Sequence, residues 1–198
     1  MQSNDKLYQL NKHKVELLKN LALLFNKNSV KWWLSDGFAL EANLGEDSLV
    51  REHKDIDIIV SNLYLDKVEE LLVDIGLDTK KETDNLLRAI DNKRNIIVDI
   101  LHYNFLQDGS ALVKMKKEIG RDIILPAVIF DSKPKNYFGV KVRTVRPELI
   151  YLDYKNSKLP KNYHQNDMEL LEELLDKDML NKIADSNIYL TDDEIKKL

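Results

Sequence analysis

The run Asp55-Ile56-Asp57-Ile58-Ile59-Val60 constrains the fold of this chain more than any other part of the sequence. Side chains of a β-strand alternate between two faces, so Asp55 and Asp57 share one face while Ile56 and Ile58 share the other. The run is therefore predicted to be a strand with a buried apolar face and two converging carboxylates. Such a pair can bind a hard cation such as Mg²⁺. The alternative interpretation is a carboxylate pair on a solvated strand edge.

A third carboxylate, Asp99, lies inside an otherwise apolar run over residues 96–101. An unpaired carboxylate in a covered strand would cost several kcal/mol. If this strand lies beside the strand 56–60, Asp99 completes a cluster of three carboxylates that can bind a metal ion, and one member can serve as general base toward an incoming hydroxyl. The alternative is a salt bridge from Asp99 to Arg88 or Arg94, which belong to the same predicted hairpin.

Hydrophobic periodicity predicts an α+β fold, a mixed twisted β-sheet flanked by helices and followed by a helical C-terminal segment. Helices are predicted over residues 4–27, 38–44, 64–75 and 168–175, from Pro147 onward, and after a capping box at 191–194. Strands are predicted over residues 30–34, 56–60, 86–90, 96–101, 123–130 and 140–145. A change in character near residue 146 divides the chain into a domain over residues 1–146 and a helical segment over residues 147–198.

The turn Ser35-Asp36-Gly37 lies between a predicted strand and a predicted helix. A small residue and a Gly at such a turn leave backbone N–H groups free at a helix N-terminus, where phosphates can bind. Gly also ends many strands that bind nothing. The turn alone is therefore weak evidence for a phosphate site.

The composition restricts the chemistry that the chain can perform. The 198 residues include no Cys, which excludes disulfides, thiolate zinc sites and cysteine nucleophiles. The net charge of −4 does not favour a broad attraction to nucleic acid. The start of the chain lacks the features of a signal peptide, and no apolar run approaches the ~20 residues that span a bilayer. We therefore expect a cytoplasmic protein without a membrane partner.

In this order and spacing, three segments resemble the motifs of the nucleotidyltransferase superfamily that includes DNA polymerase beta. The resemblance is closest to the lincosamide nucleotidyltransferases and the aminoglycoside 2''-adenylyltransferases. The segments are Trp33-Leu34-Ser35-Asp36-Gly37-Phe38-Ala39, Arg51-Glu52-His53-Lys54-Asp55-Ile56-Asp57-Ile58 and Val98-Asp99-Ile100-Leu101-His102. The resemblance covers residues 30–175. Where the family has Gly or Ser, this chain has Asp36, whose charge would repel a triphosphate.

The resemblance implies a nucleotidyltransferase fold with its catalytic domain in residues 1–146. It implies one or two Mg²⁺ ions on the catalytic residues Asp55, Asp57 and Asp99, and a nucleoside triphosphate held by Ser35, Gly37, Arg51 and His53. The implied reaction transfers a nucleoside monophosphate to a hydroxyl of a small molecule, such as an aminoglycoside- or lincosamide-type antibiotic, and releases pyrophosphate.

The acceptor of such a reaction is less constrained by the sequence. An acidic cleft formed by Asp36, Glu41 and Asp99 would suit a cationic acceptor. Asp167, in the predicted C-terminal helices, is interpreted as an ordinary helix-face charge. The alternatives are a toxin-type nucleotidyltransferase acting on tRNA or protein, and a catalytically silent nucleotide-binding module, which Asp36 would favour. Neither the preferred base nor the oligomeric state follows from the residues, and a homodimer is one alternative.

Overall fold

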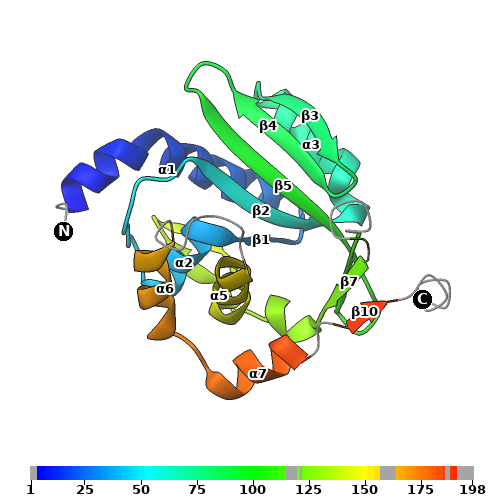
Figure 1. Cartoon of the computed structure of the whole chain (residues 1–198). Coiled ribbons are helices and arrows are strands. Elements are labelled where there is room, and N and C mark those ends of the chain that lie inside the picture. Colours follow the sequence, from blue (N-terminus) through cyan, green and yellow to red (C-terminus); the bar gives the residue numbers. More distant parts are fainter. Residues whose placement is uncertain (1–3, 115–119, 121, 157–163, 186–187, 191–198) are drawn as a thin grey trace.

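The computed structural model describes residues 4–114, 120, 122–156, 164–185 and 188–190. The fold is built on a mixed sheet whose central strands, β2 (Asp55–Ser61) and β5 (Ile96–Phe105), run parallel (Figure 1). On one side of this pair, β1 (Trp32–Leu34) lies antiparallel to β2. On the other side, β4 (Leu86–Asp91) lies antiparallel to β5, and β3 (Asp78–Thr83) pairs with β4.

The long strand β5 extends the sheet beyond its parallel pairing with β2. Its last residues pair with β6 (Ala111–Val113), which pairs with β7 (Asp122–Leu125). The strand β10 (Ile188–Leu190) pairs with β7, so the C-terminal part of the chain returns to the sheet. A separate hairpin is formed by β8 (Lys135–Tyr137) and β9 (Val140–Val142).

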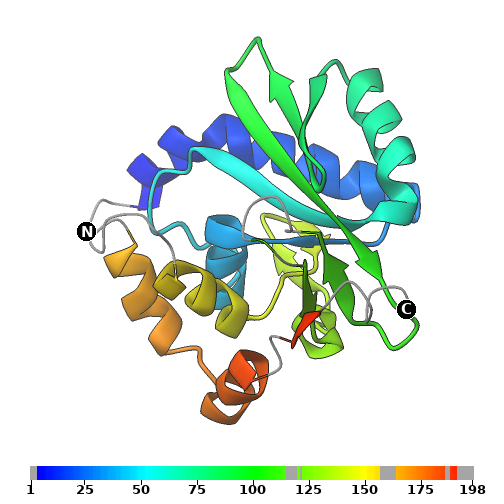
Figure 2. The same ribbon diagram turned by 45° about the vertical axis from the view of Figure 1, so that its right-hand side comes forward.

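Helices lie on two opposite sides of this sheet (Figures 1 and 2). The helix α3 (Leu65–Asp74), which follows a short 3₁₀ turn at Asn62–Tyr64, lies beside β3. The helices α2 (Asp36–Leu44), α5 (Pro147–Asn156) and α6 (Gln165–Glu172) pack against one another. Figure 2 shows α5 and α6 below the sheet, on the opposite side of the molecule from α3. This group of helices forms a wall facing the carboxylate-bearing strands.

Two further helices complete the described part of the fold. The helix α1 (Asn4–Lys27) places its regularly spaced apolar residues against β2 and β9, as the sequence predicts. The helix α7 (Lys177–Asp185) contacts α5. Among the described residues, none of the helices combines the length and apolar character that spanning a bilayer requires.

The core centres on β1, in which every residue is buried. Trp33 stacks on Phe105 with ring centroids 5.0 Å apart, and its indole Nε1 donates to the carbonyl of Phe130 at 2.8 Å. Trp32 packs edge-on against Phe25 of α1. Aromatic pairs of this kind add to the free energy gained by burying the rings. The core therefore fixes the strand that leads into the turn at Ser35.

The α+β class, the adjacency of the two carboxylate strands and the hairpin over residues 86–101 are as predicted, and the structure adds that the two carboxylate strands run parallel. The predicted strand over 123–130 is wrong in its second half. Pro126 lacks a backbone N–H and fixes φ, and the chain continues as the 3₁₀ helix Ala127–Phe130. The strands β3, β6, β8 and β10 and the helix α7 were not predicted. The predicted capping box at 191–194 lies outside the described residues.

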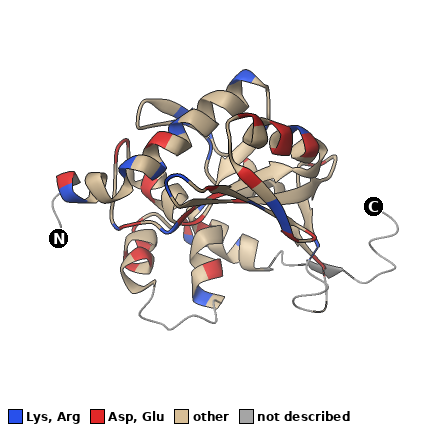
Figure 3. Ribbon diagram, turned by 90° about the horizontal axis from the view of Figure 1, so that it is seen from above, with Lys and Arg blue, Asp and Glu red and all other residues tan. Residues whose placement is uncertain are grey.

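The division at residue 146 stays a prediction. The helix α5 begins at Pro147, where the sequence changes character, but β10 shows that the segment beyond this point is not entirely helical. Figure 3 shows acidic and basic residues interspersed over the fold, with both signs on neighbouring segments of the strands. The described residues therefore carry no extended region of a single sign of charge in this view.

Candidate active site

The register of the sheet brings three carboxylates together. In the parallel pair β2 and β5, Asp57 lies directly opposite Asp99, and Asp55 is two residues before Asp57 on the same face. Each of the three residues offers a carboxylate oxygen, and these oxygens all lie within 4.8 Å of one another. A set of carboxylate oxygens at this spacing fits a hard divalent cation such as Mg²⁺. The cluster predicted from the sequence is therefore formed in the fold.

Asp99 is also ion-paired with Arg88 of the neighbouring strand. Arg88 Nε donates to Asp99 Oδ1 at 2.8 Å, and Arg88 Nη2 donates to Oδ2 at 2.7 Å. The two residues face each other directly in the antiparallel pair β4 and β5. The sequence offered a metal cluster and a salt bridge as alternatives for Asp99, and the structure combines them.

Burial and neighbouring carboxylates raise the pKa values of two acidic residues of the site, Asp57 and Asp36. Burial raises the pKa of Asp57 well above its ordinary value, and the nearby charges of Asp36, Asp55 and Asp99 raise it further. Burial in the cleft wall, and then the charge of Asp55, raise the pKa of Asp36 from 3.8 to about 6. Crowded carboxylates with raised pKa values are stabilised when a cation binds among them. The site is therefore electrostatically suited to a cation.

A cleft of about 330 Å³ opens beside the three carboxylates. Its acidic lining consists of Asp36, Asp55, Asp57 and Asp153, and its basic lining includes Arg51 and Lys54. Asp153 and Tyr154 reach the cleft from α5, so the C-terminal helices form one of its walls. Of the three residues predicted to form an acidic cleft, Asp36 lines it, but Glu41 is fully buried behind it and Asp99 is buried and not part of its lining, so the prediction is wrong for these two residues. Asp153 provides the cleft lining with an acidic side chain that the sequence did not single out.

The turn at Ser35-Asp36-Gly37 leads into the cleft. The backbone N–H of Ser35 donates to the carbonyl of Asp57 at 3.0 Å, which fixes the turn against β2. Asp36 begins α2 with φ of 51°, a left-handed conformation that Asp tolerates better than most residues. Gly37 and Asp36 line the cleft. Ser35 is buried, and its role in nucleotide binding stays a prediction.

Gly37 allows two side chains to approach the helix closely. A Cβ atom at this position would lie 2.5 Å from Arg51 Nη2 and 2.7 Å from the imidazole of His53. These distances are shorter than van der Waals contact. The Gly therefore places the guanidinium of Arg51 at the N-terminus of α2, beside the carboxylates.

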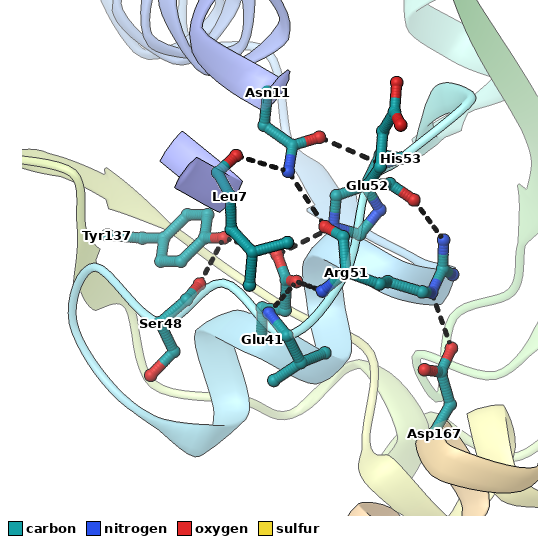
Figure 4. Close-up of polar contacts among 10 residues, drawn as sticks. Leu7, Asn11, Glu41, Ser48, Arg51, Glu52, His53, Tyr137 and Asp167 are labelled. Carbon is teal, nitrogen blue, oxygen red and sulfur yellow. Dashed lines mark hydrogen bonds and ion pairs between the residues drawn. The ribbon is translucent and has the colours of Figure 1, made fainter. Parts of the chain in front are cut away.

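Arg51 also connects the loop before β2 to the C-terminal helices (Figure 4). Its Nε donates to Asp167 of α6 at 2.8 Å, and the carboxylate of Asp167 is buried. The interpretation of Asp167 as an ordinary helix-face charge is therefore wrong. No local pattern marks Asp167, because its partner lies in a distant part of the chain.

His53 is held in a buried network rather than in open solvent. Its Nε2 lies 2.8 Å from Glu41 Oε2, and its ring stacks on Phe38 with centroids 3.9 Å apart. The same Glu41 accepts hydrogen bonds from the hydroxyl of Tyr137 and the backbone N–H of Val50 (Figure 4). This network fixes the loop that carries Arg51. His53 also lines the cleft, so its predicted contact with a nucleotide remains open to test.

Comparison with solved structures identifies the architecture as a nucleotidyltransferase fold. One similar structure is the lincosamide antibiotic adenylyltransferase LnuA with bound lincomycin, with 22% sequence identity over 84% of this chain and 97% of that chain and a TM-score of 0.63. Another is ANT(2'')-Ia in complex with adenylyl-2''-tobramycin, with 17% identity over 86% of this chain and 94% of that chain and a TM-score of 0.69. No curated protein sequence matches the chain significantly.

The profile of the aminoglycoside-2''-adenylyltransferase family matches residues 17–170, which is most of the chain. The protein belongs to this family and is a nucleotidyltransferase. The matched region contains the three carboxylates, the turn at Ser35 and the cleft-wall residues Asp153 and Asp167. The resemblance stated from the motifs is thereby confirmed.

Proposed function

We propose that the protein transfers a nucleoside monophosphate, in a reaction that depends on a divalent metal, to a hydroxyl of a small molecule that carries amino groups. The observation that supports this most directly is the cluster of Asp55, Asp57 and Asp99 beside a cleft with additional carboxylates. A nucleoside triphosphate donor would place the reaction in the cytoplasm.

The reaction forms a bond from the acceptor hydroxyl oxygen to the α-phosphorus, and the bond to the leaving pyrophosphate breaks. Asp55 and Asp57 would hold Mg²⁺, and Asp99 would complete the ligand set or accept the proton of the hydroxyl. When bound, the cation neutralises charge on the phosphate oxygens. Arg51, held at the N-terminus of α2, supplies a positive charge that can orient the triphosphate.

The acidic residues outside the metal cluster support a cationic acceptor. Asp36 and Asp153 line the same cleft from α2 and α5 and are not among the three clustered carboxylates. Protonated amines are attracted to such a surface, and an aminoglycoside, which carries several of them, gains more than a lincosamide with its single basic amine. Among the similar structures, the ligand of ANT(2'')-Ia is an adenylylated tobramycin. We therefore favour an aminoglycoside-type acceptor over a lincosamide.

The test is a transfer assay with purified protein. Each nucleoside triphosphate, labelled at the α-phosphate, is incubated with Mg²⁺ and with tobramycin or lincomycin, and products are identified by mass spectrometry together with released pyrophosphate. A mass increase of one nucleoside monophosphate on tobramycin is expected. Transfer to lincomycin alone would contradict the aminoglycoside-type acceptor, while nucleotide binding without transfer to any acceptor would indicate a silent binding module.

Expression in bacteria distinguishes a resistance enzyme from the remaining alternative, a toxin-type nucleotidyltransferase. A resistance enzyme should raise the antibiotic concentration that the cells tolerate. A toxin-type nucleotidyltransferase should arrest growth in the absence of any antibiotic and should label tRNA or protein.

A further inference from the structure

The ion pair between Arg88 and Asp99 lies in a row of charges that crosses three strands. Asp57 on β2, Asp99 on β5 and Arg88 on β4 are directly paired neighbours, so their side chains share one face of the sheet. Arg88 thus approaches the carboxylate cluster from the side opposite Asp57. Besides Asp99, the charges of Glu82 and Asp55 act on its guanidinium.

The geometry of this pair fixes the plane of the Asp99 carboxylate. Two parallel hydrogen bonds, at 2.8 and 2.7 Å, join the guanidinium fork to both carboxylate oxygens. A carboxylate has about four lone-pair positions, so a bidentate arginine leaves others for a metal ion. The ion pair and metal binding are therefore compatible, and the arginine determines which lone pairs face Asp55 and Asp57.

We propose that Arg88 is a positioning residue of the active site, which holds the Asp99 carboxylate toward Asp55 and Asp57 and offsets part of the charge of the cluster. This inference rests on the proposed function, because the orientation of Asp99 matters only for a reaction at the cluster. Arg88 acts through Asp99.

These two effects of Arg88 oppose each other when the residue is changed. Loss of its positive charge increases the attraction of the cluster for a divalent cation. Loss of its two hydrogen bonds frees Asp99 to rotate, and a misplaced reacting group slows the chemical step. In the Arg88→Gln variant, Mn²⁺ should bind about 3- to 10-fold more tightly, while nucleotidyl transfer should fall about 10- to 100-fold. A merely structural role would weaken both.

The chain supplies a matched control in the same hairpin. Arg94 pairs with Asp91 through one contact of 3.6 Å, and its side chain is 42% exposed, compared with 33% for Arg88. The Arg94→Gln variant should retain wild-type Mn²⁺ affinity and transfer. The Arg88→Lys variant keeps the charge without the two-pronged contact. It should bind Mn²⁺ like the wild type and transfer at an intermediate rate.

The experiment measures Mn²⁺ binding by electron paramagnetic resonance in the absence of nucleotide, and pyrophosphate release from ATP with tobramycin or lincomycin. Thermal unfolding monitors the fold. Tighter Mn²⁺ binding with slower pyrophosphate release in Arg88→Gln supports the proposal. Unchanged Mn²⁺ affinity, unchanged release, or a joint loss of affinity and thermal stability overturns it. A wild-type protein that does not bind Mn²⁺ contradicts the proposed function itself and removes the basis of this inference.

Discussion

Arg51 Nε and Asp167 Oδ2 lie 2.8 Å apart, although 116 positions separate the two residues in the sequence. The pair links the loop before β2 to α6 and thereby places the C-terminal helices over the cleft. Tyr154 of α5 lies close to the same arginine. The shape of the cleft therefore depends on a contact between two segments that are far apart in the sequence.

Replacing Asp167 with Ala should weaken this attachment. The guanidinium of Arg51 would lose its partner in a half-buried position, and the free energy of unfolding should fall by about 1–3 kcal/mol. Chemical denaturation measures this loss. The Glu172→Ala variant changes an exposed carboxylate on the same helix and should cost less than about 0.5 kcal/mol. Equal losses in the two variants would show that the ion pair does not hold the helix.

Replacing Asp57 with Asn should abolish transfer and metal binding together. The amide is neutral, so the cluster loses a charged ligand, and activity should fall by at least about 100-fold. In EDTA the same variant should unfold at a higher temperature than the wild type, because a crowded carboxylate has been removed. The control is Asp74→Asn at the exposed end of α3. Retained activity in Asp57→Asn would exclude the carboxylate cluster as the catalytic centre.

The raised pKa of Asp36 predicts a pH dependence of stability in EDTA. The pKa of Asp36 is about 6 in the folded protein, compared with an ordinary value of 3.8. The Asp36 carboxylate therefore binds a proton more tightly in the folded protein than in the unfolded chain. The stabilisation from this tighter proton binding is fully present below pH 4 and is lost as the pH rises through about 6. Its loss should lower the free energy of unfolding by about 1–3 kcal/mol. Denaturation between pH 4 and pH 7.5 should show this loss in the wild type and a smaller one in Asp36→Asn. Identical pH profiles of stability in the wild type and in Asp36→Asn would contradict the assignment of this pH dependence to Asp36.

Replacing Gly37 with Ala should disturb the site because the added methyl group overlaps with neighbouring side chains. The added methyl would meet Arg51 at 2.5 Å and the imidazole of His53 at 2.7 Å. The end of Arg51 can move, but His53 is buried and stacked on Phe38, so we expect a loss of about 1–3 kcal/mol and reduced transfer. In Gly45→Ala the nearest atom, Ser48 Oγ, lies at 3.4 Å, so this variant serves as the control. A fully stable and active Gly37→Ala would show that the close approach is not required.

The metal cluster could be predicted from the sequence because its geometry follows from local rules. Alternation along β2 places Asp55 and Asp57 on one face, and the apolar run around Asp99 indicates a covered neighbouring strand. The alternation along one strand and the apolar surroundings of Asp99 are thus enough to predict the carboxylate cluster. The partnership of Asp99 with Arg88 was also available from the hairpin, as one of two alternatives.

The cleft wall could not be predicted in the same way. Asp153 and Asp167 lie on helices whose placement depends on tertiary packing, and neither residue stands out in the sequence around it. The strand β3 is a polar edge strand without alternating apolar residues, so it carries no strand signal. The predicted location of Glu41 was wrong because the turn of α2 that carries Glu41 faces Tyr137 and not the cleft.

The pairing of β4 with β5 has an evolutionary consequence for Arg88. The turn at residues 92–95 sets which β4 residue faces Asp99, and side chains alternate along a strand. A one-codon deletion in this turn that shifted the β4 register by one would leave Asp57 opposite Asp99 but move Arg88 to the other surface of the sheet. In related genes, length variation in this turn should therefore come in pairs of codons wherever the arginine is retained.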